Sequence, residues 1–154
     1  MSALSDYLES GLLHHIFRGQ SFPKPSEIAI ALTSGVPLDS HTGSTIPELP
    51  SGINGSGTGY ARINLGDPSV DGNNVWMYLL EDHQAGSGIV KNSGAFLFNT
   101  ALLDWGWVSG IAIVDDSRYG SGNLLMHSPL SNPRIIYMGD TVKFDTSTLQ
   151  IKFS

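Results

Sequence analysis

Two adjacent pairs of titratable residues are the first places in this sequence to look for metal chemistry. His14-His15 stand side by side, and neighbouring residues on a helix point about 100° apart, so both cannot readily face one metal ion. Asp115-Asp116 open a Gly-rich turn, where carboxylates could bind calcium together with backbone oxygens. No other histidine lies at metal-ligand spacing, and no calcium-loop pattern surrounds the two acids, which more often cap a turn. The sequence therefore predicts no metal site and no cofactor.

Nucleophilic and acid–base centres are equally hard to assemble from these residues. The chain has no cysteine, which excludes thiolate nucleophiles and thiolate zinc sites. Gly86-Ser87-Gly88 and Gly120-Ser121-Gly122 are too short for the G-x-S-x-G turn that presents a catalytic serine. The 14 acidic residues form many arbitrary pairs, and none is singled out as a glycosidase pair. We therefore expect no catalytic residue and no enzymatic activity.

Charge and hydropathy narrow the possible partners. The formal net charge is −6 and the 8 Lys and Arg residues form no basic run, which disfavours nucleic acid and anionic membranes. No apolar run approaches the roughly 20 residues of a membrane span, and residues 1–9 lack the pattern of a signal peptide. The absence of cysteine fits folding in a reducing bacterial cytoplasm. Charged residues make up only 14% of the chain, and a surface of uncharged polar groups is less costly to desolvate against neighbouring proteins.

The N-terminal segment, residues 5–18, predicts one amphipathic helix that carries both adjacent histidines. Ser5 and Asp6 are N-cap candidates, and Gly19 follows as a C-terminal stop. Large apolar side chains recur at helical spacing and form a single stripe: Leu8, Leu12, Leu13, Ile16 and Phe17.

The rest of the chain changes to short apolar runs and to a period of two, which is typical of strands. Turn residues separate these runs, among them Asn132-Pro133 and Gly139-Asp140, and the second turn leads into a predicted last hairpin. The pattern predicts a mainly β fold, an antiparallel β-sandwich of jelly-roll-like type with one N-terminal α-helix, in a single domain of residues 1–154. The predicted strands are 27–33, 60–65, 75–80, 95–98, 108–114, 123–130, 135–137, 141–144 and 149–153.

Residues 34–59 interrupt this rhythm. The segment is rich in Gly, Ser, Thr and Pro and has few apolar side chains. A stretch of this length without secondary structure is either a mobile loop or a functional loop that a partner orders, and both alternatives stay open. Together with the N-terminal helix, this loop is a candidate partner-facing surface.

Four residues are candidates for an interface with a partner. Tyr60 and Arg62 share a strand face, where they could stack as a cation–π pair or contact a neighbouring subunit, with an ordinary surface pair as the alternative. Trp105 and Trp107 share one side of an extended segment, and packing in or beside the core is their alternative. Asp104 could accept a hydrogen bond from a local backbone N–H or from an indole.

Five segments in order carry a resemblance to a known family. They are LSDYLESGLLHHIFR (4–18), IAIALTSGVP (28–37), GYAR (59–62), DWG (104–106) and GIAIVDDSRYGSGNLLMHSPLSNPRIIYMGDTVKF (110–144). Together they resemble a family of small tailed-bacteriophage structural proteins, often labelled tail-fibre-like, some of which are capsid cement or decoration proteins. The resemblance extends over nearly the whole chain. It implies a β-sandwich or jelly-roll-like virion component without catalytic residues.

The favoured hypothesis is a cement or decoration protein on the capsid exterior, assembled in the host bacterial cytoplasm. A homo-oligomer, either a trimer or a dimer, would bridge capsomers of the major capsid protein, because symmetry reuses one modest contact several times. The alternative is a tail or fibre-associated protein that binds a host glycan or other tail components. A glycan site would need an exposed aromatic platform, for which the candidates are Trp76, Trp105, Trp107, Tyr119 and His127.

Overall fold

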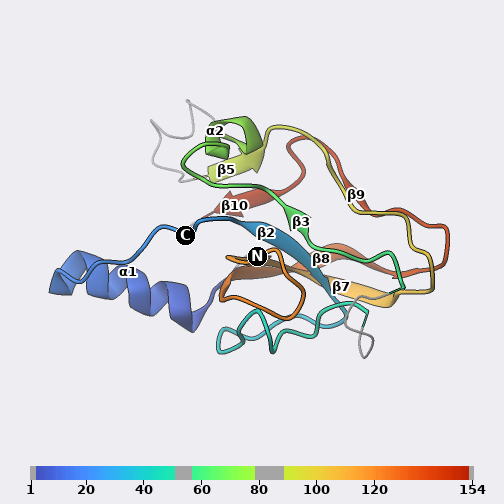
Figure 1. Ribbon diagram of the computed structural model, residues 1–154, viewed down its shortest axis with the longest axis horizontal. Helices are drawn as coiled ribbons and strands as arrows, with labels where there is room; N and C mark the ends of the chain where they lie inside the picture. The colour runs from blue at the N-terminus through green and yellow to red at the C-terminus, as the bar shows by residue number, and fades with distance from the viewer. Residues whose placement is uncertain (1–2, 51–56, 79–88, 153–154) are drawn as a thin grey trace.

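Three antiparallel sheets and one projecting helix make up the described part of the chain. The computed structural model describes residues 3–50, 57–78 and 89–152 (Figure 1). Its helices are α1 (Asp6–Arg18) and α2 (Gly72–Val75). Its strands are β1 (Ala3–Leu4), β2 (Ala29–Thr33), β3 (Ile63–Asn64), β4 (Trp76–Tyr78), β5 (Ile89–Asn92), β6 (Phe96–Leu97), β7 (Gly106–Val114), β8 (Leu124–Ile136), β9 (Lys143–Phe144) and β10 (Gln150–Lys152).

The largest sheet holds five strands in the order β1-β8-β7-β2-β3, and the smaller sheets have the orders β10-β5-β4 and β6-β9. Every strand pair is antiparallel. Side chains from β4, β6 and β9 join those of β2, β7 and β8 in one apolar cluster, so the smaller sheets cover one face of the large sheet. The predicted fold class, mainly β and antiparallel with one helix near the N-terminus, is confirmed.

The opposite face of the large sheet carries small residues and is covered by the segment 34–50. Ala29, Ala31 and Ala112 are fully buried in a cluster with Ile46 from that segment. Their single methyl groups let the covering segment approach the sheet closely, and all five residues of β2 are buried as a result. In Figure 1 this cyan segment lies on the opposite side of β2 from α2 and β5.

Residues 34–50 are therefore ordered by the chain itself. Thr33 forms a β-bridge with Glu48, and the backbone N–H of Ser34 donates to the carbonyl of Pro47 over 2.8 Å. Gly43 is needed there, because a Cβ atom at that position would lie 2.1 Å from the carbonyl oxygen of Ser121. For residues 34–50, the structure shows a loop that is ordered without a partner. Residues 51–56 of the predicted loop lie outside the described residues.

Helix α1 lies where the sequence predicts it, and of the two N-cap candidates Ser5 caps it, whereas Asp6 is its first residue. The hydroxyl of the buried Ser5 accepts a hydrogen bond from the backbone N–H of Leu8 and donates to the carbonyl of Leu124, and Gly19 ends the helix with φ +64°. Only this N-terminal end is tied to β8. No residue of α1 is buried, and Figure 1 shows the helix extending away from the sheets.

The predicted turn at Asn132-Pro133 is wrong, because β8 runs through it. Gly110 of β7 pairs with Pro129, whereas Val108 pairs with Arg134, so three extra residues of β8 bulge out between these two pairs. Prolines lack the N–H that a regular ladder needs, and the bulge accommodates them without ending the strand.

The predicted last hairpin is also wrong. Segments 141–144 and 149–153 do not pair with each other, because β9 pairs with β6 and β10 pairs with β5. Asn92, which is fully buried, holds the chain between them: its amide donates to the carbonyl of Asp145 over 2.9 Å and accepts from the N–H of Leu149 over 2.9 Å. Residues 79–80 and 153 of the predicted strands lie outside the described residues, and so does Gly86-Ser87-Gly88.

The N-cap contacts predict a measurable cost for Ser5→Ala. The substitution removes the cap of α1 and leaves the Leu124 carbonyl without its donor, so the free energy of unfolding should fall by about 1–2 kcal/mol. Urea denaturation would measure this. Ser10→Ala, on the exposed side of the same helix, is the matched control and should change stability by less than about 0.5 kcal/mol. Equal values for the two variants would contradict the capping role.

Candidate functional site

The four predicted interface residues fall into two groups. Tyr60, Arg62 and Trp105 are buried within the chain, whereas half of the Trp107 surface is exposed. In this conformation only Trp107 offers side-chain area to a partner. The prediction that these residues contact another protein stays a prediction, but the structure assigns the three buried residues an internal role.

Arg62 is a buried cation whose five N–H donors all have acceptors. Its Nε and Nη2 bind the two carboxylate oxygens of Glu48 over 2.8 and 2.7 Å, a bidentate pair. The remaining donors reach the backbone carbonyls of Gly43, Asp116 and Ser121 over 2.7, 2.7 and 2.8 Å. Since a buried charge is costly unless it is fully paired, this cluster holds the segment 34–50 and the turn after β7 in one arrangement.

Tyr60 joins the same cluster through its hydroxyl. The hydroxyl donates to Glu48 over 2.9 Å and accepts from the backbone N–H of Leu32 over 3.0 Å. Burial raises the pKa of Tyr60 well above its usual value, and the negative charge of Glu48 raises it further. Tyr60 and Arg62 both bind the Glu48 carboxylate inside the protein, so they are not the surface pair that was one expectation. Gly59, which precedes them, has φ +79°, a backbone conformation that glycine adopts easily.

Trp105 packs around Tyr60 as part of the core. Its ring stands edge-on to the Tyr60 ring with centroids 5.4 Å apart, and its indole N–H donates to the carbonyl of Thr58 over 2.9 Å. Tyr119 also stands edge-on to Tyr60, and the Trp76 ring packs edge-on against Phe96. The residues that an aromatic platform would need are therefore used mainly for internal packing.

The paired acids Asp115 and Asp116 cap their turn. Asp115 accepts hydrogen bonds from the backbone and the side chain of Asn123, and Asp116 pairs with the Arg118 guanidinium over 2.6 Å. The hydrogen bonds from Arg118 lower the pKa of Asp116 to about 2. Within the described ranges no group of three or more His, Asp or Glu side chains could hold a metal ion.

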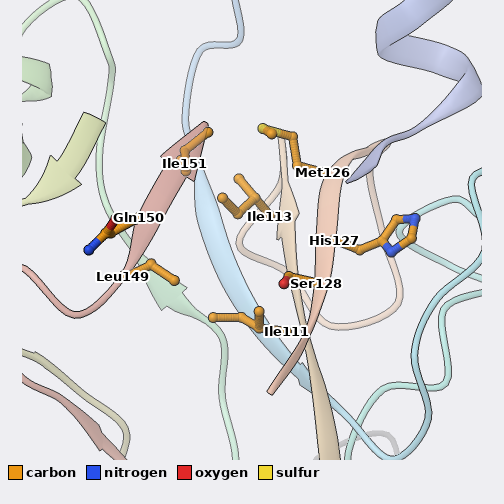
Figure 2. Close-up of a pocket in the computed structure, with 8 residues that line it drawn as sticks. All are labelled: Ile111, Ile113, Met126, His127, Ser128, Leu149, Gln150 and Ile151. Carbon is orange, nitrogen blue, oxygen red and sulfur yellow. The ribbon is translucent and has the colours of Figure 1, made fainter. Parts of the chain in front are cut away.

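The remaining histidines make local contacts. His14 and His15 contact Arg18 and the Gln20 carbonyl near the end of α1. His127 is buried on β8 and its Nε2 lies 2.8 Å from the carboxylate of Asp39, which links β8 to the segment 34–50. In Figure 2 its ring points away from the neighbouring pocket.

Two hollows lie along β8. The first is a small apolar gap in which Ile111, Ile113 and Met126 of the large sheet face Leu149 and Ile151 at β10 (Figure 2). The second is an open groove of about 540 Å³ between the β8 bulge and the segment 142–150. Its charged side chains include Lys143 and Asp145, which pair with each other over 2.7 Å. Neither hollow brings together groups for catalysis.

Large apolar side chains are exposed on α1 and around the start of β7 and the end of β8, and also at Val36, Leu38, Val70 and Leu97. We name the first two groups. The arm stripe is the exposed part of the predicted helical stripe, Leu13, Ile16 and Phe17, with exposed fractions of 57%, 66% and 77%. The end patch surrounds the start of β7 and the end of β8, where Trp107 pairs with Ile135 and the Asp104 carboxylate accepts from the N–H of Met138. Its members are Leu102, Leu103, Trp107, Ile135, Tyr137 and Met138.

Sequence reasoning found the arm stripe and only Trp107 of the end patch. Leu102-Leu103 and Met138 lie beside turn residues, outside any period of two or 3.6, so no pattern marks the side that they face. Their one signal is the occurrence of large apolar side chains directly beside Asp104 and Gly139, where turns usually expose polar residues.

Comparison with known proteins identifies the class. None of the helices in the described ranges is long and apolar enough to cross a bilayer. No curated protein matches the chain. A family match over residues 3–152 defines a structural protein of a tailed-bacteriophage virion. The chain belongs to the family described as Podophage GP4 fiber I protein gp80, which confirms the resemblance to small phage structural proteins.

The buried cluster predicts a large penalty for Arg62→Met. The substitution leaves the Glu48 carboxylate buried without its cation, so the free energy of unfolding should fall by about 3–5 kcal/mol in guanidinium denaturation. Lys143→Met removes a cation from the exposed pair with Asp145 and should cost less than about 1 kcal/mol. Similar penalties for the two variants would show that the cluster does not hold the fold together.

The pairing of Asp116 with Arg118 in the turn after β7 predicts a contribution to stability that is lost in acid. Because the folded-state pKa of Asp116 is depressed, its pairing stabilises the fold fully above the unfolded value near 3.8, and this contribution is lost as the pH falls from about 4 to about 2. Arg118→Gln should return the pKa of Asp116 towards 3.8 in a carboxyl-carbon NMR titration. Lys24→Gln, which removes an exposed cation elsewhere, should leave it unchanged.

Proposed function

We propose that this protein is a fibre-associated assembly subunit of a podophage particle, which acts by binding neighbouring virion proteins and not by catalysis. The observation that carries the proposal is the arm stripe on α1, three large apolar side chains held in solvent by a capped helix. Full burial of side chains of this kind contributes about 1.5–3 kcal/mol each, so a partner that covers them gains substantial affinity.

The helix itself supports a binding role. A 13-residue helix is only marginally stable in water unless it packs against something, and α1 is fastened to the sheet at its N-terminal end alone. The apolar stripe starts in the body, where Leu8 packs against the cluster of Ile113, Leu125 and Met126, and continues outward to Phe17. The outer half of the stripe is therefore available for contact with another protein.

The family description favours a location in the fibre over a location on the head. The family that matches nearly the whole chain is described as a fibre protein, and this description supports a position at the tail. The second possible location is the capsid exterior, where the protein would act as a cement protein with the major capsid protein as its partner. There too the exposed apolar side chains of α1 would make the contact. Trp76 and Trp105 pack inside the protein and are not free to form an aromatic platform for a glycan. This packing favours contact with other virion proteins over glycan binding.

The proposal predicts that the arm stripe is needed for incorporation into particles. Phage that carry Ile16→Ser with Phe17→Ser should contain at least about tenfold fewer copies of the protein per particle, because two side chains no longer contribute to the contact. Quantitative mass spectrometry of purified particles measures the copy number. Cryo-microscopy of wild-type particles shows whether the protein lies at the tail or on the head.

Val70→Ser provides the matched control. Val70 is 73% exposed and lies outside both apolar surfaces, so particles with this variant should carry the normal copy number. Serine resembles isoleucine, phenylalanine and valine in helix propensity, and the isolated arm variant should therefore keep its circular dichroism spectrum. Normal incorporation of the arm variant would refute the proposed function.

A further inference from the structure

The arm stripe and the end patch lie at opposite ends of the molecule. Figure 1 places the long axis horizontally, with α1 at one end and the start of β7 and the chain after β8 at the other. The sheets stand between them, so the stripe of one molecule cannot cover the patch of the same molecule. Any contact between these two surfaces joins different copies.

The free length of α1 has one open apolar side. Phe22 from the returning segment covers another part of the helix: its ring lies 5.6 Å from the Tyr7 ring, and a Cβ atom on Gly11 would lie 2.2 Å from it. Leu13, Ile16 and Phe17 lie at spacings of three and four residues and so form a compact exposed surface beyond this contact.

The end patch has two members on paired strands, and its other four lie on the segments that flank them. Trp107 and Ile135 are direct cross-strand neighbours, and the Gly139 N–H donates to the Ala101 carbonyl over 2.7 Å, which fixes the two flanking segments together. Strand addition at the nearby edge of β8 is disfavoured, because Pro129 and Pro133 cannot donate to a new ladder. The patch is therefore suited to receive a helix face and not an extended strand.

The charges beside the two surfaces are complementary. Arg18 stands next to the arm stripe at the free end of α1 and is exposed. Asp104 and Asp140 are exposed beside the end patch, where they also accept the backbone N–H groups of Met138 and Tyr137. Arg134 precedes Ile135 in β8 and also lines the open groove, so two carboxylates and one cation lie near the patch. An arm that enters from a neighbouring copy brings its cation to the more acidic side.

From these observations we infer that a second copy of this chain is the occupant of the end patch: the α1 arm of one molecule docks its stripe onto the end patch of the next. The contact is head-to-tail, so it leaves one arm and one patch free and continues until it closes into a ring or extends as a filament. This inference deepens the proposed function, on which it rests, by naming the partner.

The contact is small and therefore weak in solution. A helix of 13 residues is about 20 Å long and about 10 Å wide, and the outer half that carries the stripe presents roughly 150 Å² on one side. This area lies below the standard interface size, so the expected dissociation constant is in the range of about 10 µM to 1 mM. Repetition along a ring or a fibre raises the effective concentration and makes such a contact sufficient in the particle.

Sedimentation velocity up to about 1 mM protein tests the inference with two variants. The arm variant is Ile16→Ser with Phe17→Ser, and the patch variant is Leu103→Ser with Met138→Ser; Trp107→Ser replaces the patch variant if that protein does not fold by circular dichroism. Wild-type protein should form dimers and larger species as the concentration rises. Each variant alone should stay monomeric, and Val70→Ser should behave as wild type.

The decisive measurement is a mixture of the two variants. The arm variant keeps an intact patch and the patch variant keeps an intact arm, so an equimolar mixture should form one-to-one dimers and nothing larger. Dimers in the mixture support the head-to-tail contact. Wild-type protein that is monomeric at about 1 mM, an arm variant that still associates, or a mixture without dimers would each overturn it.

The inference and the proposed function fail separately. If wild-type protein stays monomeric in solution while particles lose the arm variant, the arm binds a different virion protein and only the head-to-tail contact is refuted. If particles incorporate the arm variant normally, the proposed function is refuted, whatever the sedimentation data show.

Discussion

The buried ion pair between Arg62 and Glu48 is the constraint on which the rest of this structure depends. A guanidinium inside a protein must use all of its donors, and here the acceptors come from Glu48 and from the backbone at Gly43, Asp116 and Ser121. Two stretches of chain without regular secondary structure are thus held in one geometry. The pair also positions Tyr60 through its hydroxyl group. The rings of Trp105, Phe98 and Tyr119 pack around the Tyr60 ring.

This constraint explains why the large sheet has both faces covered. The smaller sheets pack on one face through large side chains, and the segment 34–50, which Arg62 holds through Gly43 and Glu48, closes over the alanines on the other. A mainly β domain with both faces of its central strands occupied has little flat apolar surface to offer a partner. The exposed apolar side chains on α1 and around the start of β7 therefore lie at the ends of the molecule.

An arrangement of this kind suits a virion component. The fully paired Arg62–Glu48 cluster and aromatic packing hold the described residues in one arrangement, while the exposed apolar surfaces lie on a projecting helix and around the ends of β7 and β8. Separation of these two roles favours small contact surfaces, because a body that is already ordered loses less conformational entropy on binding. In a particle with many copies, small contacts on rigid bodies add up.

The sequence alone determined the local features of this protein. The bounds and caps of α1, the short apolar runs that mark β2 and β7, the turn at Gly139-Asp140 and the capping role of Asp115 and Asp116 all follow from residues at most a few positions apart or from short runs. Tertiary structure alone decided that β9 pairs with β6 and β10 with β5, that Arg62 points inward, and that the arm stripe stays in solvent. Those outcomes depend on contacts between residues that lie 14 to 59 positions apart in the Arg62 cluster, and on Asn92 reaching across 53 positions to Asp145. No local period or turn signal records such contacts, because they arise only when the whole chain has to satisfy its buried polar groups at once.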